Sequence, residues 1–307
     1  MNKENNSLNP NFIGIGASRS GTTWLLTVLE EHPEVSFPYA KELNYLSSPR
    51  SDDQPSEYEK RGIKGYLKLF ESCDKNKIKG ELSNHYLPDK KVATIIKKHF
   101  PNVKIFVSIR NPVERAFSDY LSSKKFHLQE KDSFEEAFYK EKNILYKKGR
   151  GYKERGLYYQ QLKPYFDLFP KENIHVVLFD DIENNPEKVV KDFYNFLGIK
   201  DSFIPPSLHK VINKSPETKF KLLKKAISFL AALSHKLEKG SLGPFLFYIK
   251  RKTKADKFFN NINKANTKPA EKEKLDSYLY KKINQFYIKD IKNLEKLIKR
   301  DLSPWRS

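Results

Sequence analysis

The sequence lacks the features of a disulfide-stapled or membrane-spanning protein. Cys73 is its single cysteine, so no disulfide forms within the chain of 307 residues, a length that buries a stable core without one. The longest apolar stretch, AISFLAAL at residues 226–233, is far shorter than the roughly 20 residues that span a bilayer. The first ten residues, MNKENNSLNP, contain no apolar core of a signal peptide. We therefore expect a soluble, cytoplasmic protein.

Acidic residues are too few to balance the basic ones. Lysine and arginine together number 58 and aspartate and glutamate 38, which gives a formal net charge of +20. Such a charge concentrates polyanions, nucleotides or acidic membranes around the protein, without indicating which of them binds. Many of the lysines lie in helix-like runs such as KFKLLKKAISF, where a solvated helix face explains them equally well.

Apolar runs typical of buried strands alternate with amphipathic patterns in the first two thirds of the chain. The strand-like runs are NFIGIG, IKGEL, VKIFVSI and IHVVLF, at residues 11–16, 78–82, 103–109 and 174–179. Each precedes a helical pattern; one opens at Asn111-Pro112 and another ends at Gly198. Strands that alternate with crossover helices predict an α/β fold with three αβα layers and a mainly parallel central sheet.

We expect one domain over residues 1–307, with a flexible N-terminus at residues 1–10 and a nucleotide-binding core at residues 12–200. Residues 47–60 combine proline, serine and charge, which predicts an exposed loop. Strand signals disappear after residue 200, so residues 201–307 are expected to be helical. A helix over residues 270–300 is expected to pack on the sheet. Residues 220–260 are open to three roles: a lid, a membrane-contacting surface or core packing.

A glycine-rich loop, GIGASRSGTTW at residues 14–24, joins the first strand to the first helix. Gly16 and Gly21 keep the spacing of a Walker loop, but Thr22 stands where that loop has its lysine. A glycine turn at this point directs backbone N–H groups and the positive end of the helix dipole at an anion. Arg19 is the only cation of the loop.

The missing lysine weakens the case for magnesium-dependent phosphoryl transfer. No acidic strand end stands out as a partner that would hold the metal. A sulfuryl group carries less negative charge than a terminal phosphoryl group, and one side-chain cation with backbone donors suffices to transfer it.

Residues 18–23, SRSGTT, resemble the 5′-phosphosulfate loop of the sulfotransferases that use 3′-phosphoadenosine 5′-phosphosulfate (PAPS). The resemblance implies a P-loop-like sulfotransferase fold. It also implies that Arg19 stabilises the bridging oxygen as the sulfuryl group leaves. Trp24 occupies the position at which cytosolic members stack adenine. The residues implied to surround the 5′ phosphate are Ser20, Gly21, Thr22 and Thr23.

A second stretch, VSIRNPVERAFSDY at residues 107–120, is similar to the family motif that binds the ribose 3′ phosphate. By this resemblance Arg110 and Ser118 bind that phosphate. Arg110 follows a predicted parallel strand, where open α/β sheets bind ligands, and Ser118 lies on the second turn of the next helix. Lys214 lies in LHKVINKSPE, a position from which relatives reach the same phosphate. The stretch RGLY at residues 155–158 contains the glycine and the tyrosine that lie near the nucleotide in relatives.

Sulfuryl transfer requires a general base that removes the acceptor proton, and Glu42 is the candidate. It opens ELNYL, which fits the E-x-x-[FY]-[FL] pattern of the glycosaminoglycan branch and follows the HPEVSF turn. Without the family pattern, Glu42 and its lysine neighbour are an ordinary solvated pair. The stretch IKGELSNHYL resembles the heparan-enzyme pattern E-K-[ST]-P-x-Y, but Leu82 replaces the lysine and Asn84 the proline. His85 is either a substitute proton acceptor or a packing residue.

Together these motifs imply a sulfotransferase that moves a sulfuryl group from PAPS to a hydroxyl or amine of a saccharide acceptor. The displacement is in line, Arg19 and Glu42 are catalytic, the product is 3′-phosphoadenosine 5′-phosphate (PAP) and no metal is implied. Two alternatives stay open: a P-loop nucleotide kinase, and a non-enzymatic anion-binding or nucleic-acid-binding module. No nucleic-acid reader motif is present, so nucleic acid is not the expected partner. Peripheral membrane contact, regiochemistry and the oligomeric state stay open.

Overall fold

The computed structural model describes residues 7–39, 42–48, 54–125, 133–140, 151–210, 217–218, 267–268 and 273–307. The chain divides into two compact units, residues 1–210 with 275–307 and residues 211–274. In the second unit, β6 (Glu217–Thr218) pairs antiparallel with β7 (Thr267–Lys268). Lys214 and the residues 220–260, for which the sequence left three roles open, lie outside the described residues.

The first unit is built on a five-stranded parallel sheet with the order β2-β3-β1-β4-β5. The strands are β1 (Phe12–Gly14), β2 (Val35–Ser36), β3 (Ile78–Leu82), β4 (Lys104–Ile109) and β5 (Ile174–Leu178). Four of them confirm the predicted strands and their parallel direction. The edge strand β2 was not predicted, because two residues within the HPEVSF turn give no strand signal.

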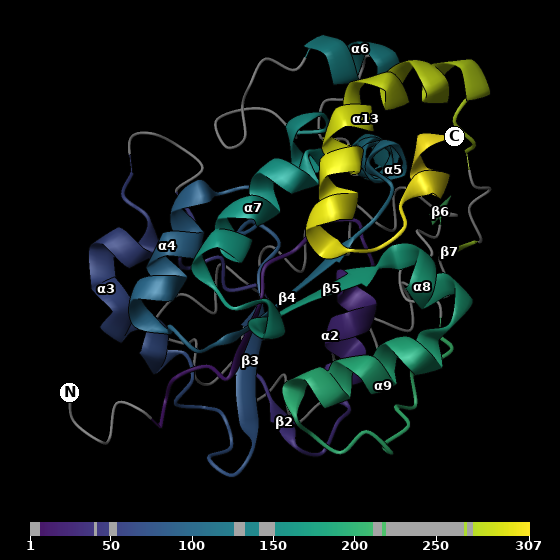
Figure 1. The fold of residues 1–307 in the computed structure, drawn as a ribbon. Helices are drawn as coiled ribbons and strands as arrows, with labels where there is room; N and C mark the ends of the chain where they lie inside the picture. Colours follow the sequence, from purple (N-terminus) through teal and green to yellow (C-terminus); the bar gives the residue numbers. More distant parts are fainter. Residues whose placement is uncertain are drawn as a thin grey trace. The chain divides into compact units, whose positions relative to one another are not determined.

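Helices cover both faces of this sheet, as Figure 1 shows. On one side lie α2 (Thr22–Glu30), α8 (Phe179–Asn184) and α9 (Pro186–Leu197), and on the other α3 (Glu57–Lys68), α4 (Lys90–His99) and α7 (Tyr158–Leu168). Three more helices, α5 (Pro112–Lys125), α6 (Phe134–Lys140) and α13 (Ser277–Ile298), gather at one end. Single 3₁₀ turns complete the unit: η1 (Glu154–Gly156), η2 (Lys171–Asn173) and η3 (Ser303–Arg306). The predicted three-layer α/β fold is confirmed.

Strand side chains alternate between the two helical layers, as the pleat of a strand requires. On β4, Phe106 meets Phe193 of α9 with ring centroids 4.7 Å apart. Its neighbours Ile105 and Val107 belong instead to the core that contains Ile96 of α4. The sheet is therefore buried on both faces, and only its strand ends remain available for a binding site.

Local sequence signals account for where several helices begin and end. The Asn111 side chain accepts hydrogen bonds from the N–H groups of Val113 and Glu114, 3.0 and 3.2 Å away, at the start of α5. Gly198 ends α9 in the left-handed conformation, with φ of 76°. Both predicted boundaries are confirmed, and the first of them fixes the helix that bears Ser118.

Two expectations about the periphery were wrong. Residues 47–60 are not a loop throughout, because Ser56 and Glu59 form a reciprocal capping box that starts α3 at Glu57. The C-terminal helix α13 makes its main contacts with α7 and α5 rather than with the sheet. α13 therefore packs mainly on the helices α7 and α5 rather than directly on the strands.

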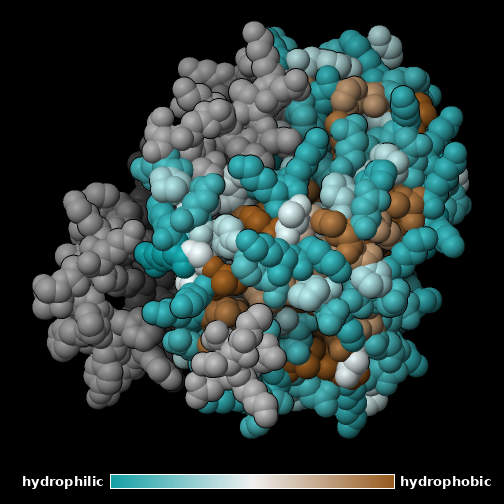
Figure 2. All heavy atoms as spheres, turned by 60° about the vertical axis from the view of Figure 1, so that its left-hand side comes forward, coloured by the Kyte–Doolittle hydropathy of each residue, from teal (hydrophilic) through white to brown (hydrophobic). Residues whose placement is uncertain are grey.

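The described surface is dominated by polar side chains. Figure 2 shows one face, on which hydrophilic residues predominate and hydrophobic residues form small separate patches. Among the described helices, none combines the length and the apolar character needed to cross a membrane.

Candidate active site

The phosphate loop leads from the end of β1 into the N-terminus of α2. Gly21 is the N-cap residue and has a left-handed φ of 82°, and no side chain caps this helix end. A Cβ atom on Gly21 would lie 3.0 Å from the side chains of Phe179 and Ile182, so the position has no room for one. The first N–H groups of α2 thus face a site where an anion fits the helix dipole.

The structure brings the two predicted phosphate motifs together at the ends of neighbouring strands. Arg19 of the loop after β1 donates a hydrogen bond from Nε to Oγ of Ser118 on α5, 3.1 Å away and 99 residues later in the chain. The Ser108 hydroxyl, near the end of β4, donates to the backbone oxygen of Ser20. These bonds lock the loop to the element that bears the second motif.

Arg110 follows β4 and is held by two further groups. Its Nε and Nη2 donate to one carboxylate oxygen of Glu114, at 2.9 and 2.7 Å. Its guanidinium carbon lies 4.5 Å from the ring centroid of Phe179. The same ring limits the space at Gly21, so Phe179 underlies both the 5′-phosphosulfate loop and the arginine of the 3′-phosphate motif.

Positive charge accumulates between these elements. Burial lowers the pKa of Arg19; Asp119 opposes this change, and Arg110 and Arg115 add to it. Arg115 is completely buried and donates from Nη2 to the backbone oxygen of Tyr152 at 2.5 Å. Its Nη1 lies 3.5 Å from a carboxylate oxygen of Asp119. Three guanidinium groups near two carboxylates, Glu114 and Asp119, leave an electropositive site that suits a polyanionic ligand.

Two buried hydroxyls at this site form no well-aligned hydrogen bond within the described part of the chain, although they interact with each other. They belong to Ser20, which is 0% exposed, and to Tyr158, also 0% exposed, at the start of α7. Burial raises the pKa of Tyr158, and the neighbouring Arg115, Ser20 and Arg110 oppose that rise. A buried hydroxyl without a well-aligned hydrogen bond costs about 1–3 kcal/mol. An anionic ligand that accepts hydrogen bonds would satisfy both hydroxyls, so the residues present fit a phosphorylated donor.

The remaining predicted donor-site residues differ in exposure. Thr22 is buried and Thr23 exposed on the first turn of α2. Trp24 is 6% exposed, and its indole Nε1 donates to the backbone oxygen of Leu208 at 3.1 Å. The role of Trp24 beside adenine stays a prediction, as does any contact of Lys214.

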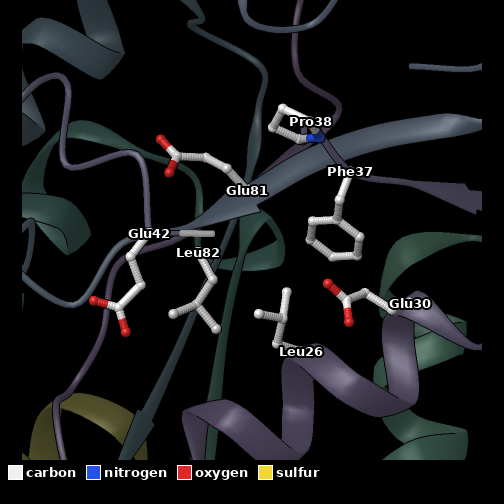
Figure 3. Close-up of a pocket in the computed structure, with 7 residues that line it drawn as sticks. All are labelled: Leu26, Glu30, Phe37, Pro38, Glu42, Glu81 and Leu82. Carbon is white, nitrogen blue, oxygen red and sulfur yellow. The ribbon is translucent and has the colours of Figure 1, made fainter. Parts of the chain in front are cut away.

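The candidate base Glu42 lines a small pocket beside the phosphate loop (Figure 3). The lining residues are Leu26, Glu30, Phe37, Pro38, Glu42, Glu81 and Leu82. Asn84 donates from Nδ2 to Oε1 of Glu42 at 2.6 Å. Asn84 also packs on the phosphate loop, because its backbone oxygen lies 3.4 Å from where a Cβ on Gly16 would be. One asparagine thus places the exposed Glu42 carboxylate next to the loop that contains Arg19.

The two residues that differ from the heparan-enzyme pattern, Leu82 and Asn84, both lie near Glu42. Leu82 lines the pocket at the position where the pattern has lysine. Asn84, which replaces the proline, makes the bond to Glu42. His85 faces away toward another partner, since its Nδ1 lies 3.4 Å from Nη2 of Arg155.

Sequence reasoning missed three residues that shape the site: Glu114, Arg115 and Glu81. Spacing of i,i+4 links Arg110 with Glu114 and Arg115 with Asp119, and this spacing could have predicted both pairs. Glu81, at the end of β3, fills the first position of the E-K-[ST]-P-x-Y pattern, but the sequence alone assigned no role to it, because one of its partners comes from α3. No cluster of three or more metal-ligating side chains occurs in the described ranges.

Comparison with known proteins agrees with this geometry. A sulfotransferase domain model matches residues 9–286. A solved sulfotransferase from Alicyclobacillus acidocaldarius is 26% identical, with a TM-score of 0.69 over 97% of this chain and 99% of that one.

Curated relatives include the membrane-associated sulfotransferase kil1 of Dictyostelium discoideum, 25% identical over 273 residues, and the human heparan sulfate glucosamine 3-O-sulfotransferase 5, 28% identical over 201 residues. Each match covers 62% of this chain, which spans about half the length of these relatives, 56% and 54%.

These findings define the class of the protein as an α/β enzyme with a phosphosulfate-type anion loop. The chain belongs to the sulfotransferase family. The predicted family, fold and enzyme class are confirmed.

Proposed function

We propose that this protein transfers a sulfuryl group from PAPS to a saccharide hydroxyl or amine, with Glu42 as the general base and PAP as the product. One observation carries the proposal. Arg19, Arg110 and two buried hydroxyls converge at the ends of β1 and β4, and Asn84 holds Glu42 beside the same loop. The arrangement supports a donor with two separate phosphate groups and an acceptor that enters from the Glu42 side.

The donor side of the reaction rests on the phosphate loop and on α5. Bound PAPS supplies an activated sulfuryl group on a phosphate leaving group. The residues proposed to hold its 5′ phosphate are Ser20, Gly21, Thr22 and Thr23; those proposed to hold its 3′ phosphate are Arg110 and Ser118. Arg19 bonds to Ser118, and this fixed position supports a role for its charge in stabilising the leaving oxygen as it becomes negative.

The acceptor side rests on Glu42. Its carboxylate is exposed, so an acceptor reaches it from solvent, and the 2.6 Å bond from Asn84 fixes one of its oxygens. A base in a fixed position removes the acceptor proton while the oxygen or nitrogen attacks sulfur.

A saccharide is the acceptor class that the observations favour. The ELNYL stretch follows the glycosaminoglycan-branch pattern, several relatives are named for heparan sulfate, and the net charge of +20 attracts acidic chains. Leu82 at the lysine position argues for an acceptor that differs from heparan sulfate. A cytoplasmic location and a peripheral contact with membranes belong to the proposal as well.

The decisive test combines acceptor screening with one substitution. The purified protein is given radiolabelled PAPS and a panel of acidic glycans, neutral oligosaccharides, tyrosine peptides and simple alcohols. With the acceptor found, Glu42→Gln should lower kcat by about 10²–10⁴-fold, because the base is lost. PAP affinity, measured by calorimetry, should stay unchanged, and Glu57→Gln on the exposed part of α3 is the matched control.

A nucleotide kinase is the competing function, and the same calorimetry separates the two. Heat with magnesium ATP, together with none for PAPS or PAP, would overturn the proposal. Transfer at the wild-type rate by Glu42→Gln would leave a sulfotransferase but remove Glu42 as its base.

A further inference from the structure

Glu81 is a buried carboxylate that the proposed mechanism does not use. It lies at the end of β3 and is 2% exposed. Figure 3 shows its side chain directed away from Phe37 and Leu26. A buried carboxylate without compensation is costly, so its partners indicate what it does.

Three side-chain hydroxyls converge on this carboxylate. Tyr66 of α3 and Tyr86 donate to Oε1, at 2.8 and 2.7 Å, and Ser83 donates to Oε2 at 2.6 Å. Burial raises the pKa of Glu81 to about 7, the three hydrogen bonds oppose the rise, and the nearby Glu42 adds to it. We call Glu81 with Tyr66, Ser83 and Tyr86 the Glu81 cluster.

Two hydroxyls of the Glu81 cluster also bind the chain that follows Glu42. Ser83 Oγ accepts a hydrogen bond from the N–H of Asn44 at 2.8 Å. The Tyr86 hydroxyl accepts from the N–H of Leu46 at 3.4 Å. One carboxylate at the end of β3 thus orients two acceptors that fix the backbone of residues 44–46.

The turn with Glu42 needs such support, because two of its residues have left-handed backbones. Glu42 has φ of 53° and Asn44 has φ of 46°, and neither is glycine. Such a conformation costs of order 1 kcal/mol or more per residue and persists only where surrounding contacts hold it. Those contacts come from the segment next to Glu81: Ser83 binds Asn44, and Asn84 binds the Glu42 carboxylate.

We propose that Glu81 is the positioning residue of the active site: through Ser83 and Tyr86 it holds the turn at residues 42–46, and so sets where the Glu42 carboxylate lies. Because Glu81 is 2% exposed and its carboxylate is bonded to three hydroxyls, it acts through these neighbours. The catalytic part of this inference rests on the proposed role of Glu42. The structural part, the hold on the turn, stands independently of it.

The test uses three variants. Glu81→Ala removes the acceptor of all three hydroxyls, whereas Glu81→Gln keeps an oxygen for both tyrosines and an N–H₂ that can donate to Ser83. Ser83→Ala removes the bond to Asn44 and one of the three donors to Glu81 but leaves both tyrosine bonds, and it covers the case in which Glu81→Ala does not fold. Asp290→Ala is the matched control: Asp290 is a buried carboxylate with a pKa raised to about 6, but it binds the N–H groups of Tyr159 and Gln160 on α7.

Two measurements decide the outcome. Amide hydrogen exchange of residues 42–48 should become faster in Glu81→Ala and Ser83→Ala and remain slow in Glu81→Gln and Asp290→Ala. The kcat for sulfuryl transfer should fall about 10²-fold in Glu81→Ala, with PAP affinity unchanged, because misplacing a catalytic group by an ångström has such an effect. Glu81→Gln should recover most of that loss.

Several results would overturn the inference. One is wild-type exchange and wild-type kcat in folded Glu81→Ala and Ser83→Ala, with folding judged by PAP binding. Another is an equal loss of kcat in Glu81→Gln and Glu81→Ala, since the amide preserves the positioning contacts. If Glu42→Gln proved fully active, the proposed base would be lost, but the exchange of residues 42–48 would still decide whether Glu81 holds the turn.

Discussion

The two halves of the active site are built in different ways. The donor half uses cations, hydroxyls and N–H groups from segments that directly follow β1 and β4, such as Arg19 and Arg110. The acceptor half uses carboxylates. Residues 42–46 are held by hydrogen bonds with Ser83, Asn84 and Tyr86, each 39 to 42 positions later in the chain than its partner.

This difference indicates which half of the proposed site can accept amino-acid substitutions. Strand ends and a helix N-terminus are fixed by the sheet, so the donor half follows from the fold itself. The acceptor half depends on a turn with two left-handed residues and on the Glu81 cluster. Specificity for the acceptor can thus change with few substitutions, while donor binding stays the same.

The largest effect is expected on the donor half. Arg19→Ala should lower kcat by about 10³-fold, because the leaving oxygen loses its fixed cation. The rate is measured by transfer of radiolabelled sulfate. Arg61→Ala is the control, since Arg61 is 70% exposed and pairs with Glu57 on α3, away from the phosphate loop in the chain. A rate for Arg19→Ala within tenfold of wild type would contradict a catalytic role of Arg19.

The second-largest effect is expected for Glu81 in the acceptor half, and it concerns how the free energy of unfolding depends on pH. The folded protein raises the pKa of Glu81 from 4.5 to about 7, so it binds this proton more tightly than the unfolded chain does. The contribution of Glu81 to the free energy of unfolding should therefore be largest below pH 4.5 and fall by on the order of 3 kcal/mol as the pH rises to 7.

Glu81→Gln removes this contribution. Urea unfolding at pH 5 and at pH 8 should show a smaller loss for Glu81→Gln than for wild type. Taking the difference between the two proteins cancels Asp290, whose pKa is also raised, to about 6, and His175, whose pKa is lowered to about 4. Parallel curves for the two proteins would mean that Glu81 does not titrate in this range.

A moderate effect is expected for Arg110→Ala, which should weaken PAP binding about 10–100-fold through loss of charged hydrogen bonds. Calorimetry gives the affinity, and kcat at saturating donor should change little. The substitution Glu114→Gln separates the charge of Arg110 from its orientation. It keeps the arginine but weakens the bonds of 2.7 and 2.9 Å that orient it. Unchanged PAP affinity in Arg110→Ala would remove the 3′-phosphate assignment.

The smallest effect is expected for Ser118→Ala. It removes the hydroxyl that accepts from Nε of Arg19 at 3.1 Å, and PAP affinity should fall about fivefold, the value of one neutral hydrogen bond. Thermal stability should change little, since in the described ranges the bond of this hydroxyl is to a side chain, that of Arg19. A loss larger than that of Arg110→Ala would reverse the order of the two 3′-phosphate residues.

The sequence predicted the donor half better than the acceptor half, for a physical reason. Strands at residues 78–82 and 103–109, the cap at Asn111 and the loop with Arg19 are local patterns, and each emerged where the sequence indicated. Glu42 was a candidate only through the family pattern. Glu81 fits the first position of the heparan-enzyme pattern, but its role could not be predicted, because only the fold brings the tyrosines from α3 and the next loop to its carboxylate.

The ring of Phe179 lies close to both parts of the donor half, the loop at Gly21 and the guanidinium of Arg110. It abuts Gly21 on the loop for the 5′ end and lies 4.5 Å from the Arg110 guanidinium, the group for the 3′ end. In the proposed function, Gly21 belongs to the 5′-phosphate site and Arg110 to the 3′-phosphate site, so the ring of Phe179 would set the separation of the two sites.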